Sequence, residues 1–164
     1  MKKRILKVIV GTSMAIVVVA AFAQVWVSAQ VDNGETLVGS WDVLVTPRVC
    51  ETGDPAPFPP AFAAVQTYNQ GGTMQASHPN APEVVSFDSH GVWNHTKGRQ
   101  YSIAFRVLKF NLDGTYAGKD VIRDVITLDS GGNTYTSTGG VDILDSNGNL
   151  ILRGCATTTA TRFE

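Results

Sequence analysis

The stretch LVGSWDVLVT, residues 37–46, alternates between apolar and polar positions, as a half-buried β-strand does. One face of this strand would carry Leu37, Gly39, Trp41, Val43 and Val45. We expect that face to point into the interior of a barrel. There Gly39 gives the backbone room, and Trp41 closes one end. This strand is the starting point for the rest of the fold.

The remainder of the chain continues the β pattern. Clusters of Gly, Asn, Asp and Ser recur at short intervals, and the segments between them are rich in Val, Ile, Thr, Tyr and Phe. Helical spacing of apolar residues is not sustained in any segment after residue 29. The sequence therefore predicts an all-β domain. The expected strands are 36–46, 61–69, 72–78, 90–96, 100–111, 115–128, 133–144 and 149–162.

Two segments fall outside this pattern. VCETGDPAPFPP, residues 49–60, is proline-rich and favours an extended loop, because proline cannot donate to a strand ladder. Residues 78–89 are also irregular, with room for a short extra strand around 84–87. The last four strands are joined by short turns and should form an antiparallel meander. Eight such strands predict a single eight-stranded antiparallel up-and-down barrel.

Closure of a barrel makes its first and last strands neighbours. Cys50 lies just past the end of the first strand, Cys155 lies within the last strand, and the sequence contains no other cysteine. An antiparallel pairing of these two strands would bring the two sulfur atoms within bonding range. The sequence therefore predicts a Cys50–Cys155 disulfide, which requires an oxidising compartment.

The N-terminal segment resembles a secretory signal peptide of bacterial type. A basic start, MKKRILK, precedes an apolar stretch and small residues at Ala23 and Ala29. We expect a signal peptide over 1–29 and a barrel domain over 30–164, with cleavage after Ala23 or an uncleaved anchor as the alternatives. The protein would then be exported, either periplasmic or extracellular, with no stable membrane insertion after cleavage.

The charge balance restricts the partners. Removing the four basic residues of the signal leaves nine basic and 14 acidic residues, a formal charge of −5. This balance argues against nucleic acid and anionic membranes as partners, because both require basic patches.

The G-x-W of Gly39 and Trp41 resembles the first strand of the calycin group, which includes lipocalins, fatty-acid-binding proteins and avidins. The resemblance implies a small β-barrel in which an arginine of the last strand, Arg153 or Arg162, packs over Trp41. The chain departs from lipocalins because it has no acidic–aromatic motif in its middle and no helix after the last strand. The segments GSW, TPRVCETG, NQGGT, HGVW and RGC also resemble exported bacterial barrel proteins of unknown function.

Candidate chemical groups gather in FDSHGVWNH, residues 87–95. Asp88 and His90 would share a strand face, so that the carboxylate could orient the imidazole. His90 and His95 would lie on opposite faces, and their spacing relative to His78 does not support a metal site. DSNGN, residues 145–149, begins like a calcium loop but lacks its later ligands, so we interpret it as a hairpin turn. We expect no cofactor and no metal.

Two of the long expected strands, 100–111 and 115–128, carry apolar residues on both faces. Residues 115–128 place Asp120 and Asp124 on the same face as apolar residues. Either the outer wall packs against a second subunit, which would make a homodimer, or the lumen holds carboxylates, for example Asp124 paired with Arg106. The first alternative is the more common arrangement.

The leading functional hypothesis is a barrel that binds a small apolar or amphipathic molecule in its lumen. The candidate lining residues are Trp41, Phe62, Tyr68, Trp93, Tyr101, Phe105 and Tyr135.

Two alternatives stay open. One is a cofactor-independent cyclase or isomerase, a type of enzyme also found on eight-stranded barrels such as those resembling allene oxide cyclase. It would use His90 and Asp88 for acid–base work and Tyr101 or Tyr135 as hydrogen-bond donors. The other is a structural or interaction protein with a filled barrel. Of the two, the non-enzymatic function is favoured.

Overall fold

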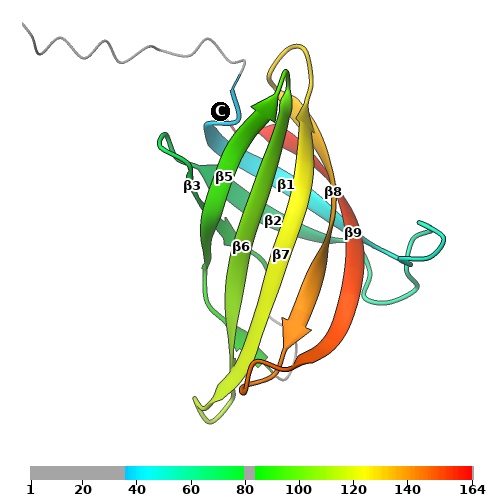
Figure 1. Cartoon of the computed structure of the whole chain (residues 1–164), viewed down its shortest axis with the longest axis vertical. Coiled ribbons are helices and arrows are strands. Elements are labelled where there is room, and N and C mark those ends of the chain that lie inside the picture. The colour runs from blue at the N-terminus through cyan, green and yellow to red at the C-terminus, as the bar shows by residue number, and fades with distance from the viewer. Residues whose placement is uncertain (1–35, 80–83, 164) are drawn as a thin grey trace, which may run out of the picture. The chain divides into compact units, whose positions relative to one another are not determined.

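The computed structural model describes residues 36–79 and 84–163, and the predicted signal peptide lies outside this part of the chain. The described residues form nine β-strands (Figure 1). They are β1 (Gly39–Arg48), β2 (Phe62–Tyr68), β3 (Thr73–Ser77), β4 (Val84–Ser86), β5 (Ser89–Lys97), β6 (Gln100–Asn111), β7 (Tyr116–Leu128), β8 (Thr134–Leu144) and β9 (Leu150–Arg162).

Eight of these strands form the predicted closed antiparallel barrel. Each of β1, β2, β3, β5, β6, β7, β8 and β9 pairs with the next, and β9 returns to pair with β1. The closing ladder runs from Trp41 opposite Arg162 to Arg48 opposite Cys155. The short β4 pairs with the end of β6, beyond the part of β6 that pairs with β5. The extra strand expected around 84–87 is therefore confirmed.

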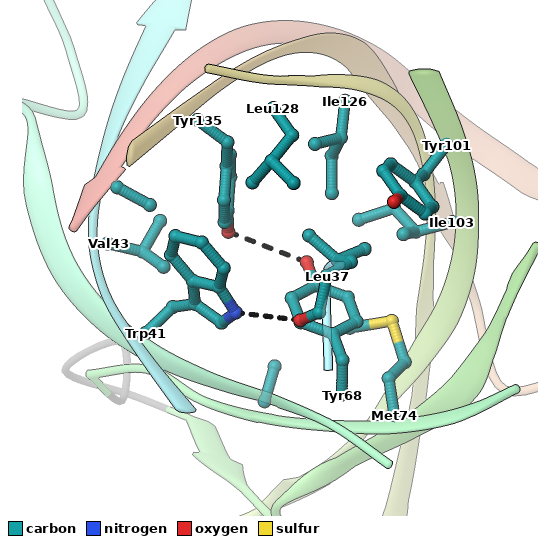
Figure 2. Packing of buried hydrophobic residues seen from close by; sticks show 12 residues of the cluster. Leu37, Trp41, Val43, Tyr68, Met74, Tyr101, Ile103, Ile126, Leu128 and Tyr135 are labelled. Atoms are coloured by element: carbon teal, nitrogen blue, oxygen red, sulfur yellow. Dashed lines mark hydrogen bonds between the residues drawn. The ribbon is translucent and has the colours of Figure 1, made fainter. Parts of the chain in front are cut away.

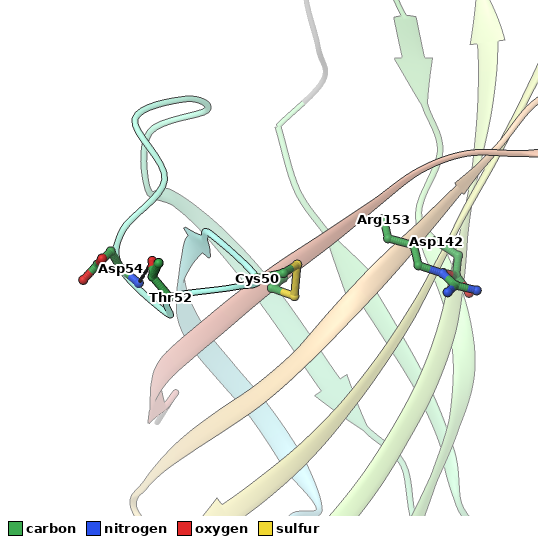
Figure 3. The surroundings of a disulfide bond; sticks show 6 residues. Cys50, Thr52, Asp54, Asp142 and Arg153 are labelled. Carbon is green, nitrogen blue, oxygen red and sulfur yellow. Dashed lines mark hydrogen bonds and ion pairs between the residues drawn. A yellow bond between two sulfur atoms is a disulfide. The ribbon is translucent and has the colours of Figure 1, made fainter.

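The disulfide also forms as predicted. Cys50 follows β1 and is bonded to Cys155 of β9, with their Cα atoms 5.2 Å apart (Figure 3). It links the proline-rich connection between β1 and β2 to the last strand. A disulfide bond of this kind fits an oxidising compartment.

Aspartates organise the hairpin turns. In the β8–β9 turn, the Asp145 Oδ1 accepts hydrogen bonds from the backbone N–H groups of Asn147 and Asn149, at 2.9 and 2.8 Å. Gly148 in the same turn has a φ of +88°, a backbone conformation that favours glycine. Asp129 plays the same part between β7 and β8. DSNGN is thus a hairpin turn, as predicted.

The connections at the two ends of the barrel differ in polarity. At the end where β1 begins, the connections after β2, β5 and β7 are polar turns. At the end where β1 terminates, large apolar side chains are exposed in or beside three separate connections. Phe58 is 82% exposed in the β1–β2 loop, Leu112 76% in the β6–β7 turn, and Ile151 65% beside the β8–β9 turn. We call the first end the closed end and the second the mouth.

Candidate functional site

The floor of the lumen is a cluster of aromatic rings near the closed end (Figure 2). Trp41 and Tyr135 meet edge to face with ring centroids 4.8 Å apart, and Tyr68 lies 6.4 Å from Tyr135. Trp93 and Tyr101 extend the cluster with centroids 5.8 Å apart. The buried aliphatic residues Leu37, Ile126 and Leu128 fill the space between the rings. This end of the barrel is a packed core.

Arg162 seals the closed end from outside. Its guanidinium carbon lies 4.3 Å from the centroid of a Trp41 ring, so the cation–π contact implied by the calycin resemblance is present and comes from Arg162. The same side chain donates hydrogen bonds to the carbonyl oxygens of Thr36, Val38 and Gly132, at 2.6, 2.7 and 2.9 Å.

The space that Arg162 occupies explains the glycine of the G-x-W motif. A Cβ on Gly39 would lie 2.7 Å from Nη1 of Arg162, and Gly39 has a φ of +130°. Only a residue without a side chain fits both constraints. Arg153, the other candidate, instead forms an ion pair with Asp142 at 3.0 Å.

Two tyrosines and a glutamine form a hydrogen-bonded layer inside the lumen. The hydroxyl groups of Tyr68 and Tyr135 both donate to Oε1 of Gln66, at 2.5 and 2.6 Å. Burial raises the pKa of both tyrosines well above the ordinary range, with the charge of Asp124 adding to the effect. Both hydroxyl groups are therefore neutral and act as donors at physiological pH.

Asp124 lies in the lumen beside this layer and is only 8% exposed. Ser137 Oγ is 3.0 Å from its Oδ2, and Thr158 Oγ1 is 2.6 Å from Ser137 Oγ. A carboxylate only accepts, so Ser137 donates to Asp124 and accepts a hydrogen bond from Thr158. Burial raises the pKa of Asp124, and the hydrogen bond from Ser137 opposes that effect only in part.

The lack of a side chain at Gly139 leaves space for the Asp124 carboxyl group. Gly139 is the residue of β8 directly opposite Asp124 of β7. A Cβ at Gly139 would overlap Oδ1 of Asp124 and the neighbouring backbone. The carboxyl group therefore occupies the position of a missing side chain on the lumen wall.

Beyond Asp124, towards the mouth, the pattern of burial on the inner face changes. Near the closed end, buried and exposed residues alternate along the strands. In β7, for example, Asp124, Ile126 and Leu128 are buried and the residues between them are exposed. Further along the same face, towards the mouth, seven apolar inward positions are only partly buried, although Val107, which lies among them on β6, is 2% exposed. The seven partly buried positions are Val45, Phe62, Ala64, Phe105, Ile122, Val141 and Ala156. We call them the apolar collar.

An ion pair lies at the mouth end of this face. The Lys109 ammonium and the Asp120 carboxylate are 2.5 Å apart, on strands β6 and β7. Both side chains are largely covered, at 19% and 23% exposure. Of the two arrangements considered for this strand, a lumen that holds carboxylates is therefore the one that Asp120 and Asp124 form, because both carboxylates face inward. Arg106 is exposed on the outer wall, and the pairing with Asp124 suggested from sequence is not formed.

The seven aromatic residues expected to line a pocket all lie on the inner face, although at different depths. Trp41, Tyr68, Tyr101 and Tyr135 are buried in the floor. Trp93 and Phe105 pack against it, and Phe62 belongs to the partly buried collar. Their contact with a ligand stays a prediction.

The histidine cluster considered for acid–base work is spread over the surface. Asp88 precedes β5 and accepts a hydrogen bond from Ser77 at 2.6 Å, whereas His90 is exposed on the outer wall. The His95 ring bonds the carbonyl of Gly98 at 2.7 Å. Within the described residues, no hydrogen bond joins Asp88 to His90, and no group of three or more His, Cys, Asp or Glu residues is placed to hold a metal.

Sequence reasoning missed Gln66, Ser137, Thr158 and Lys109 as lumen residues. The alternation of β2, β8 and β9 could have revealed three of them, since Gln66, Ser137 and Thr158 each lie two positions from an inward apolar residue. Polar residues at such positions are easily taken for surface residues when the neighbouring strands are unknown.

Comparisons of the chain with protein-family models, with curated proteins and with solved structures found no match. The likeness to calycins therefore rests on the closed barrel, on Gly39 and Trp41, and on Arg162. Across the described residues, no helix is long and apolar enough to cross a membrane.

Proposed function

We propose that this protein binds a small apolar or amphipathic molecule in the mouth half of its barrel. The observation that carries the proposal is the change in burial along the inner face. The floor residues are almost completely buried, whereas the apolar collar above Asp124 is only partly covered. An incompletely covered apolar surface inside a barrel gains free energy when a ligand covers it.

The polarity of the inner face supports an amphipathic ligand. The collar offers apolar contacts, and the hydroxyl and carboxyl groups of Ser137, Thr158 and Asp124 lie at its base. The exposed apolar side chains at the mouth, such as Leu112 and Ile151, suit the passage of an apolar molecule. Export through a signal peptide over 1–29 is part of the same proposal, and the Cys50–Cys155 disulfide supports it.

The test uses two neighbouring alanines on β2. Ala64 faces the lumen and packs against the core, whereas Ala63 is exposed on the outer wall. Decanol, decylamine and decanoate share one tail and differ in head group. We expect at least one of them to bind the oxidised protein with one-to-one stoichiometry in isothermal titration calorimetry, below its micelle concentration. Ala64→Phe should abolish this binding, and Ala63→Phe should preserve it.

Two results would overturn the proposal. One is the absence of saturable binding for all three molecules. The other is equal loss, or equal retention, of binding in the two folded phenylalanine variants, because a site in the lumen must distinguish them. Circular dichroism and thermal unfolding establish that both variants are folded.

A further inference from the structure

The structure points to a cation as the polar group of the ligand, a protonated amine that pairs with the Asp124 carboxylate. This inference rests on the proposed function and specifies the chemical class of the molecule.

Among the described residues, Asp124 is buried without a positive partner. Ser137, a neutral donor, supplies its hydrogen bond at 3.0 Å. A buried carboxylate that lacks a cation is unfavourable, and a cationic ligand would offset that cost. The raised pKa of Asp124 reflects the same uncompensated burial.

The ion pairs of the described residues leave Asp124 out. Lys109 is paired with Asp120, and both Arg123 and Arg153 are paired with Asp142 on the outside of the barrel. Arg162, which is also partly buried, is bound to backbone carbonyls and to Trp41 at the closed end. The lumen beside Asp124 is therefore electrostatically negative when the carboxyl group is ionised.

The neighbouring polar groups favour the same charge. The hydroxyl groups of Tyr68 and Tyr135 stay neutral and already donate to Gln66. The Ser137 hydrogen is directed at Asp124, and Ser137 in turn accepts from Thr158. An anionic head group would meet the Asp124 charge at close range, and like charges in a low-dielectric site repel strongly.

The position of Asp124 sets the orientation of the ligand. Asp120 at the mouth end lies four residues away on β7, or about 13 Å at roughly 3.3 Å per residue. Ile122 and Val141, which face each other across β7 and β8, line the interval between them. The amine would thus lie at depth and the apolar tail would extend past the collar towards the mouth.

The test compares three ligands that share one apolar tail and differ in head group, and it removes the charge of Asp124. In calorimetry at neutral pH, we expect decylamine to bind at least tenfold more tightly than decanol and decanoate to bind most weakly. Asp124→Asn keeps the shape of the side chain and its hydrogen bond from Ser137. It should lower the affinity for decylamine at least tenfold and change the affinity for decanol by less than threefold. Asp42→Asn, the same change on the outer wall, is the matched control and should have no effect.

The outcomes separate this inference from the proposed function. Equal binding of the three molecules, or tighter binding of decanoate, overturns the cation inference while the lumen site stands. The same holds if Asp124→Asn is folded and keeps its preference for decylamine. If none of the molecules binds, the proposed function itself fails. Should Asp124→Asn not fold, the order of head groups on the unmodified protein still decides the question.

Discussion

At the scale of single residues, the closed end depends on Arg162 and the two residues that accommodate it. The guanidinium group covers Trp41 and binds three carbonyl oxygens that precede β1 or lie in the β7–β8 turn. Gly39 provides the space. One side chain of the last strand therefore joins the entry to the first strand and a turn formed by two others.

We expect Arg162→Ala to lower the free energy of unfolding by about 2–4 kcal/mol. The variant loses charge-assisted hydrogen bonds and a cation–π contact, and it exposes the Trp41 ring. Arg153→Ala on the same strand removes only an exposed ion pair and should cost less than about 1 kcal/mol. Urea unfolding followed by tryptophan fluorescence measures both. Equal costs for the two variants would show that Arg162 is not the seal of the closed end.

At the scale of strands, the pairing of β7 with β8 places Gly139 directly opposite Asp124. Their ladder is continuous from Lys119 opposite Leu144 to Leu128 opposite Tyr135. The glycine allows a charged side chain to lie flat against the neighbouring strand. The local pairing and the polar group of the lumen are thus parts of one arrangement.

Gly139→Ala should destabilise the protein by about 1–3 kcal/mol, because the new methyl group overlaps the Asp124 carboxyl group and the backbone of β7. Gly131→Ala in the β7–β8 turn is the control. Its added Cβ would come no closer than 3.1 Å to the side chain of Asp129, so the change should stay within about 0.5 kcal/mol. Thermal unfolding of the two variants gives the comparison. A neutral Gly139→Ala would mean that Asp124 can leave its position at little cost.

At the scale of the whole barrel, the disulfide and the β1–β9 ladder close the same seam. The bond joins residues 105 positions apart, and the ladder extends through eight residue pairs beside it. The ladder acts in the folded state, while the disulfide mainly restricts the unfolded chain. The two contributions can therefore be separated.

Replacing both cysteines, as Cys50→Ser with Cys155→Ser, should leave a folded barrel that is less stable by about 4–5 kcal/mol, the value that the chain-entropy model assigns to a loop of this length. Guanidinium unfolding of the oxidised protein and of the double variant tests this expectation, and circular dichroism checks that the β-structure remains. A loss below about 1 kcal/mol would contradict it, as would a double variant that does not fold.

The sequence by itself determined the β-strands, the turns, the barrel closure and the disulfide. Each depends on local chemistry: period-two alternation, aspartate and glycine in the turns, and two cysteines beside the first and last strands. Only the tertiary structure decided that Asp120 and Asp124 face inward, that Arg162 rather than Arg153 covers Trp41, and that several apolar residues of the inner face near the mouth are only partly buried. Strands with apolar residues on both faces do not reveal their inner side locally. The register with neighbouring strands sets that side, and it brings Gln66 of β2 to the same lumen as Asp124 and Ser137 of the consecutive strands β7 and β8.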